Sequence, residues 1–308
     1  MKGVWILKIL LLILSMSLFV FAESLIQPLE PVKNIDLQKA KLGKLLFFDP
    51  ILSQDETINC ASCHRSEYGW ADNKTVSVGV YNRKGIINSP TVVNAVYNFK
   101  QFWNGRADTL QEQAKGPIHT AFEMDMDNKT LEERLNKSSL YPEYFKAVYK
   151  KEKIVFNDII DAIAEYEKTL TTKDSKFDLF LKGKETLTYE EERGYRVFRT
   201  YGCITCHNGK NIGGNSFQKI GIVISYDDCY GDRYEITKRE FDKCVYKVPS
   251  LRNISKTAPY FHDGSAKTLQ DAIKVMAYHN LGFKPRQDDV ESLEAFLKTF
   301  DADLREER

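Results

Sequence analysis

The sequence is short of the features that mark several large classes of protein. Six cysteines and nine prolines in 308 residues are too few for a disulfide-built scaffold or a collagen-like chain. Lys and Arg number 44 and Asp and Glu 43, so the chain lacks the basic excess of a nucleic-acid-binding protein. After residue 22 no apolar run is long enough to span a bilayer. A hydrophobic fraction of 43% excludes a disordered chain, and the length predicts a globular protein of roughly two domains.

The beginning of the chain has the pattern of a secretory signal peptide. Lys2 and Lys8 are positively charged, the stretch 9–21 is largely apolar, and Ala22 is a small residue at the expected cleavage position. We therefore assign residues 1–22 to a signal peptide. The alternative is an uncleaved N-terminal anchor, but the apolar run is shorter than the ~20 residues that a spanning helix needs. In both cases the rest of the chain is exported, and we expect it in the periplasm.

The periodic stretches of the mature chain have helical spacing, and no alternating run predicts a strand convincingly. Capping boxes at Thr188 and Thr268 mark two helix starts. The apolar positions between Val290 and Phe300 form one face of a C-terminal helix. Further helices are expected over 131–150, broken at Pro142, and over 156–172, whereas 79–85 and 213–221 are expected to be loops. The predicted fold class is therefore mostly α.

Two Cys-x-x-Cys-His motifs carry the strongest chemical signal. They occupy 60–64 and 203–207, one in each half of the chain. Two thiols about one helical turn apart can add to the two vinyl groups of a haem, and the adjacent histidine can then bind the iron as proximal ligand. The residues that would attach two haems are Cys60, Cys63, His64, Cys203, Cys206 and His207.

Two other kinds of site also use paired cysteines. A zinc site would need two further ligands nearby, and a redox-active dithiol would need a strand–helix context. Because the motif occurs twice in an exported chain, two c-type haems are favoured over both. We expect two cytochrome c-like domains, an N-terminal one over 23–182 and a C-terminal one over 183–308, each with one covalently bound haem.

Two cysteines lie outside these motifs. Cys229 and Cys244 are separated by a short polar stretch, which suits a surface disulfide in an oxidising compartment. Two free thiols are the alternative, and the pattern favours the disulfide.

The second axial position of each haem decides function, because an open position can bind peroxide whereas a filled one only carries electrons. Met276 lies on an expected helix after the second motif, and a methionine ligand would raise the reduction potential. From spacing alone, however, an apolar core position is the better interpretation of Met276. The other residues that could fill an axial position are His119, His262, His279, Met124 and Met126.

Ordered motifs surround both cysteine pairs. They are LGKLLFFDP (42–50), NSPT (88–91), FWNGRA (102–107), QAKGP (113–117), VPSLRN (248–253) and TAPYFHDG (257–264). Together they resemble the signature blocks of the bacterial di-haem cytochrome c peroxidases and their MauG-like relatives. The resemblance runs from about Leu42 to Phe300 and so covers nearly the whole mature chain.

The resemblance assigns roles to the two haems. It makes the haem bound through His64 the low-potential, peroxidatic centre, and the haem bound through His207 the high-potential centre where electrons enter. Met276 stands at the position of the second axial ligand of the high-potential haem, so the resemblance reverses the choice made from spacing. Trp103 matches the tryptophan between the haems; a buried core aromatic is the alternative, and the residue can be both.

The resemblance also implies a distal pocket on the peroxidatic side. Glu123 matches its acid–base carboxylate, and Gln113 and Pro117 match residues that line it. A carboxylate whose pKa is raised by burial can take a proton from the near oxygen of peroxide and return it to the leaving oxygen. Without the motif, Glu123 would be taken for a solvated loop acid.

Further implications concern a cation and the partners. Asn88, Thr257 and Pro259 match the family's calcium site between the haems, and a hard cation held by carbonyl oxygens and water suits these residue types. The family also implies a homodimer. The expected electron donor is a small soluble protein, either a monohaem cytochrome c or a cupredoxin.

Two positions depart from the family pattern. Val80 stands where typical members have a histidine that caps the peroxidatic iron in the resting oxidised state, and Ile87 replaces the arginine that usually precedes Asn88. Valine cannot ligate iron, so we expect the oxidised enzyme to be open and active without reductive activation. His119 is an addition near Glu123; it is a substitute ligand, a second pocket base or, more simply, a surface histidine.

The expected function is therefore that of an exported di-haem cytochrome c peroxidase that reduces hydrogen peroxide to water. Two alternatives remain. A MauG-like enzyme would oxidise side chains of a partner protein, although MauG itself has a tyrosine where Met276 stands here. A non-catalytic electron-transfer cytochrome would need both irons capped, for example by Met276 and His119.

Overall fold

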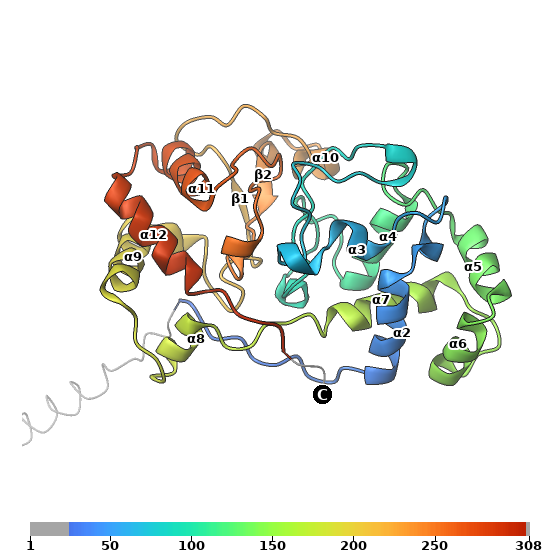
Figure 1. Ribbon diagram of the computed structural model, residues 1–308. Coiled ribbons are helices and arrows are strands. Elements are labelled where there is room, and N and C mark those ends of the chain that lie inside the picture. Colours follow the sequence, from blue (N-terminus) through green and yellow to red (C-terminus); the bar gives the residue numbers. More distant parts are fainter. Residues whose placement is uncertain (1–24, 306–308) are drawn as a thin grey trace, which may run out of the picture.

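The computed structural model describes residues 25–305, and most of its regular structure is helical (Figure 1). The expected signal peptide, 1–22, lies outside the described residues. The α-helices are α2 Leu37–Phe48, α3 Cys60–Cys63, α4 Leu110–His119, α5 Asn128–Lys137, α6 Tyr141–Tyr149, α7 Phe156–Glu167, α8 Lys176–Leu181, α9 Tyr189–Thr200, α10 Tyr234–Thr237, α11 Leu269–Met276 and α12 Gln287–Lys298. Single 3₁₀ turns occur at Pro50–Leu52, Ser66–Tyr68, Val80–Asn82, Ala95–Tyr97, Cys203–Thr205, Glu240–Asp242 and Ile254–Lys256, and a π-helical turn, Ala277–Leu281, follows α11. The strands are β1 Phe217–Lys219 and β2 Val245–Lys247.

The first half of the chain packs around the crossing of α2 and α7. Gly43 lies at this crossing, and a Cβ there would come within 1.8 Å of the carbonyl oxygen of Ala162, so only glycine lets the two backbones approach so closely. The buried side chains of α2, α4, α5, α6 and α7 form one apolar core. Cys60 and Ala61 of α3 pack against this core, so the first Cys-x-x-Cys-His motif is held by it.

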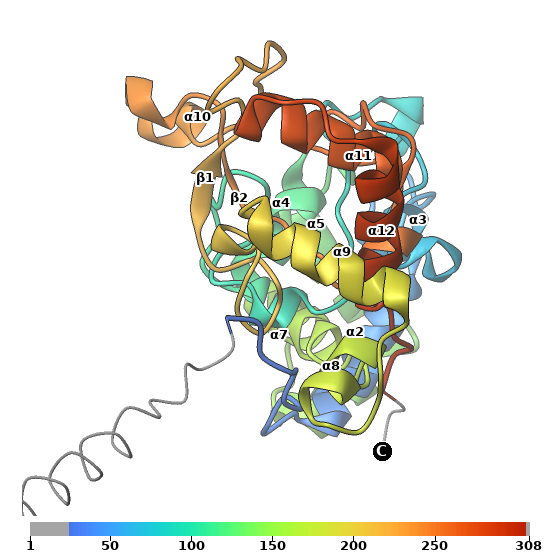
Figure 2. The same cartoon turned by 90° about the vertical axis from the view of Figure 1, so that its left-hand side faces the viewer.

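The second half repeats this arrangement with α9 and α12. Gly194 lies at their crossing, where a Cβ would be 1.9 Å from the carbonyl oxygen of Ser292. Figure 2 shows the two helices crossing, with α11 beside α12. Phe177 and Phe296 meet edge to face, 5.1 Å apart, in a second apolar core, and Cys203 packs against it. Each motif therefore lies against its own crossed helix pair.

Both ends of the described chain tie the two halves together. Ile26 pairs with Gly209 and is buried in the second core, although the following helix, α2, belongs to the first. Leu304 pairs with Thr172 and packs against the first core, although α12 belongs to the second. The proposed boundary between residues 182 and 183 remains a prediction.

A buried ion pair fastens the N-terminal segment to the second half. Arg252 Nη1 donates to Asp178 Oδ2 at 2.8 Å and Nη2 donates to Asp178 Oδ1 at 3.0 Å, and both side chains are shielded from solvent. The same guanidinium donates to the carbonyl oxygens of Lys210 at 2.7 Å and Gln27 at 3.1 Å. One side chain therefore joins three segments that are distant in the sequence.

The helix predictions are largely confirmed. α9 begins after Thr188 and α11 after Thr268, and both side chains accept hydrogen bonds from backbone N–H groups of the first turn. The range 131–150 contains two helices, α5 and α6, and Pro142 opens the second because proline is tolerated in a first turn. The mostly α class is confirmed, with one antiparallel pair, β1 and β2, that is too short to show an alternating pattern. Between residues 25 and 305, no helix combines the length and the apolar character needed to cross a bilayer.

The predicted disulfide is confirmed. Cys229 and Cys244 are joined by an S–S bond of 2.11 Å, with their Cα atoms 5.0 Å apart. The bond closes the loop that contains α10 and leads into β2, at the upper edge of the molecule in Figure 1.

Candidate functional site

The first Cys-x-x-Cys-His motif is a single helical turn, α3, that follows the end of α2. Asn59 stands before it, and its side chain donates to the carbonyl oxygen of Phe48 at 2.7 Å. The N–H of His64 donates to the carbonyl oxygen of Cys60 at 3.0 Å, which continues the turn as far as the histidine. Cys60 and Cys63 are free thiols in a chain that forms a disulfide elsewhere.

His64 is held as a neutral imidazole. Burial lowers the pKa of His64 to about 4, so its ring is uncharged at neutral pH. Its Nδ1 lies 3.3 Å from the carbonyl oxygen of Trp70, and with Nδ1 as the donor Nε2 is left as the ligand atom. This is the protonation state that a metal-binding histidine needs.

The second motif repeats this geometry in a 3₁₀ turn. The N–H of His207 donates to the carbonyl oxygen of Cys203 at 3.0 Å. Burial lowers the pKa of His207 to about 4 as well, and its Nδ1 is a buried nitrogen without a hydrogen-bond partner in the described part of the chain. Two free thiols beside a buried neutral imidazole, present twice, fit the attachment of two haems through thioether bonds and one axial nitrogen each.

Glu123 lies beside the first motif, on the segment after α4. Burial raises the pKa of Glu123, and the positive charge of Arg106 opposes this rise. Burial also raises the pKa of Cys63, to about 11, and the negative charges of Asp72 and Glu123 contribute to that increase. The carboxyl group of Glu123 is therefore near the thiol through which the first haem would be attached.

The loop 77–85 closes over the Glu123 segment. Val80 is fully buried, and its N–H donates to the carbonyl oxygen of Glu123 at 2.8 Å. A Cβ on Gly79 would lie 2.3 Å from the carbonyl oxygen of Phe122, so only glycine allows this contact. Val80, where the resemblance places the family's capping histidine, is thus an apolar side chain packed against the segment that carries Glu123.

Arg83 holds this loop in place from the outside. Its Nη1 donates to the carbonyl oxygen of Ala121 at 2.7 Å and to Asp125 Oδ2 at 2.9 Å. The guanidinium also lies over the ring of Tyr81, 4.8 Å from its centre. These contacts join the loop to the residues on both sides of Glu123.

We expect the substitution Arg83→Ala to loosen the loop. Losing charge-assisted hydrogen bonds at a partly exposed site should cost about 1.4 kcal/mol, which is roughly a tenfold faster amide hydrogen exchange over 77–85. Lys84→Ala removes a neighbouring exposed cation and is the matched control, for which we expect no change. Equal exchange in the two variants would show that Arg83 does not fasten the loop.

Trp103 lies where the two halves of the chain meet. Its Nε1 donates to the carbonyl oxygen of Asn88 at 2.9 Å, and its own carbonyl oxygen accepts the N–H of Lys247 at 2.7 Å. The indole ring meets the rings of Tyr246 and His262 edge to face, each 6.4 Å away. Contacts from both halves therefore fix the ring, which is compatible with both the core and the inter-haem interpretations.

Met276 is the last residue of α11 and is half-buried. The same helix contributes Leu269 and Ala272 to the second core, but Met276 is not a member of that core. The core position that spacing favoured for Met276 is therefore not supported. Gln113 and Pro117 lie on α4, the helix that precedes Glu123.

The other candidate axial ligands have different surroundings. His119 is exposed at the end of α4, where its Nε2 is 2.6 Å from Asn128 Oδ1 and its ring stacks on Phe156. This supports its interpretation as a surface histidine. Met124 and Met126 are buried members of the first core. His262 Nε2 lies 2.6 Å from the carbonyl oxygen of Asp228, and His279 Nδ1 lies 3.0 Å from that of Ile224, both in the segment before Cys229.

The expected calcium ligands come from both halves of the chain. Asn88 is buried, and its Nδ2 donates to the carbonyl oxygen of Lys74 at 2.9 Å, which leaves the amide oxygen as the atom available to a cation. The N–H of Asn88 donates to the carbonyl oxygen of His262, three residues beyond Pro259. Thr257 packs near Gly69, in the segment that follows the first motif. Between residues 25 and 305 no three His, Cys, Asp or Glu residues cluster as metal ligands, so this site would depend on carbonyl and amide oxygens.

Three charged residues near the site were not predicted. Arg106, in the FWNGRA block, lowers the pKa of Glu123 through its positive charge and so opposes the effect of burial. Burial lowers the pKa of Lys247, in β2, to about 8. Burial raises the pKa of Glu167 to about 8, and its Oε2 has no hydrogen-bond partner within the described residues. The sequence offers one signal for Glu167: it is a charged residue on the face of α7 that is otherwise apolar and buried.

Comparisons with known proteins agree with this geometry. A family model described as di-haem cytochrome c peroxidase matches residues 37–186. The cytochrome c551 peroxidase of Nitrosomonas europaea is 43% identical over 285 residues, which are 92% of this chain and 85% of that protein. The methylamine utilization protein MauG of Methylophilus methylotrophus is 35% identical over 251 residues, 79% of this chain and 74% of that protein.

A solved structure extends the similarity to the fold. The crystal structure of a MauG-like protein associated with microbial copper homeostasis matches with a TM-score of 0.77 and 26% identity. The match covers 92% of this chain and 95% of that one. With two haem-attachment motifs on one such fold, the chain belongs to the di-haem cytochrome c peroxidase family and is a haem-dependent peroxidase, an oxidoreductase.

Proposed function

We propose that this protein reduces hydrogen peroxide to water at the haem attached through Cys60 and Cys63, by the reaction H2O2 + 2 e⁻ + 2 H⁺ → 2 H2O. The observation that carries the proposal is the surroundings of Glu123. Its carboxyl group has a raised pKa, it lies close to Cys63, and the loop above it presents Val80 instead of an iron ligand. The greater identity to a cytochrome c peroxidase than to MauG supports this activity.

The haems, when bound, supply the electron storage and the reaction with peroxide oxygen. Glu123 takes the proton from the near oxygen of peroxide and returns it to the leaving oxygen. Its raised pKa suits this task, because the group holds a proton more readily than a solvated glutamic acid does. Arg106 holds positive charge opposite it, and Gln113 on α4 supplies an amide at the same pocket.

Electrons enter through the second half of the chain in this proposal. Met276 would hold the second haem together with His207, and its half-buried place at the end of α11, outside the second core, supports that role. Trp103 stands between the two motifs, fixed by Asn88 on one side and Lys247 on the other. The donor is a small soluble protein, a monohaem cytochrome c or a cupredoxin.

The proposal extends to the assembly. Residues 23–182 and 183–308 form the two cytochrome c-like haem domains, and a calcium ion is held at their junction by Asn88, Thr257 and Pro259. The N–H of Asn88 bonded to the TAPYFHDG segment supports this junction, because it joins the two halves at that point. After cleavage of the signal peptide the protein acts in the periplasm as a homodimer.

A MauG-like activity is the second candidate, favoured by the similarity to MauG and to the MauG-like structure. In that case peroxide would drive oxidation of side chains on a partner protein, and the mass of the partner would change. The third alternative, a cytochrome without catalysis, loses support because His119 is engaged with Asn128 and Phe156 at the surface.

The test is the stoichiometry of peroxide reduction by the protein with both haems attached. We expect two molecules of reduced monohaem cytochrome c to be oxidised for each peroxide consumed. A variant with both Cys60→Ala and Cys63→Ala should keep the second haem and lose this turnover. Peroxide consumption without oxidation of a cytochrome or a cupredoxin would contradict the proposal and favour the MauG-like activity.

A further inference from the structure

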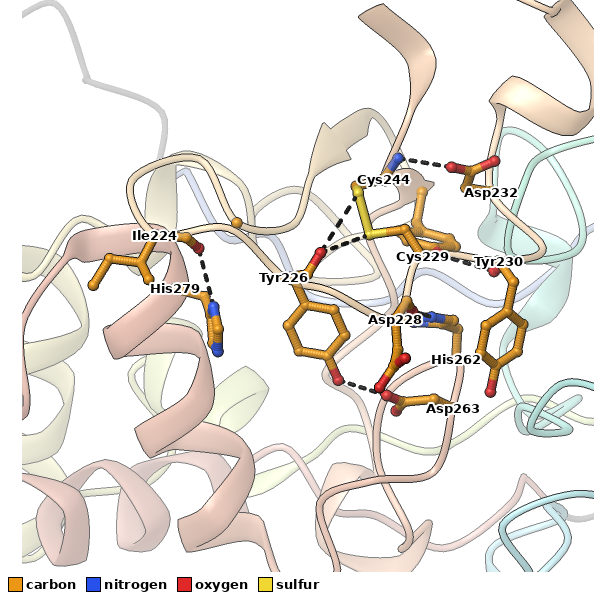
Figure 3. The surroundings of a disulfide bond; sticks show 12 residues. Ile224, Tyr226, Asp228, Cys229, Tyr230, Asp232, Cys244, His262, Asp263 and His279 are labelled. Carbon is orange, nitrogen blue, oxygen red and sulfur yellow. Dashed lines mark hydrogen bonds between the residues drawn. A yellow bond between two sulfur atoms is a disulfide. The ribbon is translucent and has the colours of Figure 1, made fainter. Parts of the chain in front are cut away.

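An aromatic cluster extends from Trp103 towards the loop that Cys229 and Cys244 close. Figure 3 shows the part of the cluster near the disulfide, with Tyr226, Tyr230 and His262. The centre of the cluster is His262, which is 2% exposed and stacks on Tyr246 with the ring centres 4.4 Å apart. The ring of Trp103 is 6.4 Å from both of these rings. Rings in such close succession allow an electron to pass from one to the next.

Tyr226 lies on the outer side of this cluster, with the ring of His279 5.0 Å beyond it. Its ring is 6.0 Å from that of His262, and its hydroxyl donates to Asp263 Oδ2 at 2.6 Å (Figure 3). The same hydroxyl is 3.0 Å from the Oγ of Ser265, an exposed residue. The phenol of Tyr226 therefore joins the buried cluster to the surface.

The position of Tyr226 relative to the cluster is fixed by its loop. His262 Nε2 is 2.6 Å from the carbonyl oxygen of Asp228, which is next to the disulfide at Cys229. The disulfide in turn anchors this end of the loop to Cys244, just before β2, the strand that carries Tyr246. Tyr226 and Tyr246 thus lie close in the sequence to the two disulfide-bonded cysteines, Cys229 and Cys244.

Only one tyrosine of the cluster is equipped to lose an electron. A phenol becomes strongly acidic when it is oxidised, so it needs a base that can take its proton. Asp263 is such a base for Tyr226. The hydroxyl of Tyr246 donates instead to the carbonyl oxygen of Tyr230 at 2.8 Å, and a peptide oxygen cannot take the proton.

We propose that Tyr226 is a redox-active tyrosine that receives oxidising equivalents from Trp103 through His262 and Tyr246 and passes them to small electron-rich phenols at the surface. The proposal rests on the proposed peroxidase function, because peroxide must first oxidise Trp103. Asp227 and Asp228 are exposed beside Tyr226, so the site would favour neutral phenols over anionic ones. The enzyme would then have a second class of reductant besides a protein donor.

The chemistry balances with hydrogen peroxide, the substrate of the proposed function, as the oxidant. Oxidised Trp103 takes one electron from Tyr226, whose proton moves to Asp263, and a tyrosyl radical forms. A phenol ArOH gives a hydrogen atom to this radical, and Asp263 releases its proton to water. Two such cycles deliver the two electrons that one peroxide needs, so that H2O2 + 2 ArOH → 2 H2O + 2 ArO•.

The first experiment looks for the radical itself. Hydrogen peroxide is added to the oxidised protein with both haems attached, without any donor, and the mixture is frozen for EPR while peroxide consumption is recorded. We expect a tyrosyl radical signal that is lost in Tyr226→Phe. Tyr230→Phe is the matched control and should keep the signal: its ring is as near to His262, at 5.0 Å, but among the described residues no carboxylate accepts a hydrogen bond from its hydroxyl.

The second experiment uses 2,6-dimethoxyphenol as the probe. We expect Tyr226→Phe and Asp263→Asn to lose peroxide-dependent oxidation of this phenol while turnover with reduced cytochrome c is retained. A radical signal or a phenol oxidation that persists in Tyr226→Phe overturns the inference and leaves the peroxidase function standing. A wild-type protein that consumes no peroxide overturns both.

Discussion

Glu123→Gln is expected to lower kcat/KM for hydrogen peroxide by about 10²- to 10⁴-fold, the usual contribution of a positioned general acid–base group. Gln has nearly the shape of Glu but cannot take the proton from peroxide. The haems should attach normally, because Glu123 lies beside Cys63 without being an attachment residue.

The pH profile separates this role from a structural one. Because burial raises the pKa of Glu123, the carboxyl group keeps its proton to a higher pH than a solvated glutamic acid does. The base form appears as the pH rises through this raised pKa, so the wild-type rate should increase over that range. In Glu123→Gln this limb should be absent.

A matched control is Glu133→Gln, which changes an exposed glutamate on α5 that has no role in the proposed chemistry. It should leave both kcat/KM and the pH profile unchanged. If Glu123→Gln kept the wild-type kcat/KM and its rate still rose with pH over the same range, Glu123 would not be an acid–base residue, and the interpretation as a loop carboxylate would hold.

Arg252→Ala is expected to lower the free energy of unfolding by about 3–5 kcal/mol, because it leaves the carboxylate of Asp178 buried without its cation. The same change removes the bonds to the carbonyl oxygens of Lys210 and Gln27, so the N-terminal segment should loosen as well. Denaturant unfolding of the protein with both haems attached measures the loss.

Two further variants test the cause of this loss. Lys146→Ala breaks an exposed ion pair with Glu152 and should cost less than ~1 kcal/mol. The double variant Arg252→Met with Asp178→Leu removes both charges and should recover much of the stability, because apolar residues of similar volume can replace a buried pair. If Arg252→Ala lowered the free energy of unfolding no more than Lys146→Ala does, the Arg252–Asp178 pair would not contribute substantially to the stability of the second half.

Local patterns explain how far the fold was predictable. The capping box at Thr188 and the N-cap at Thr268 act within one helical turn, so they are visible in four consecutive residues. The haem-attachment motifs are local in the same way. The helix crossings at Gly43 and Gly194 are not local features. Each glycine is required only because another helix backbone passes close to it, and that backbone is about a hundred or more residues away in the sequence.

The parts of the site that could not be predicted depend on distant contacts. Nothing close to Glu123 in the sequence shows that Arg106 opposes its charge, or that Val80 donates a hydrogen bond to its carbonyl oxygen. The bond between Tyr226 and Asp263 likewise joins residues 37 positions apart. That Met276 lies outside the second core also depends on distant contacts, which periodicity alone does not give.

The most direct test of an open peroxidatic centre is peroxide turnover by the fully oxidised protein, without pre-reduction, with reduced monohaem cytochrome c as donor. Because Val80 offers no iron ligand, we expect turnover to begin without a lag, and we expect Val80→His to introduce a lag that pre-reduction removes. A wild-type protein that turns over only after pre-reduction would contradict this, and would mean that another residue caps the iron.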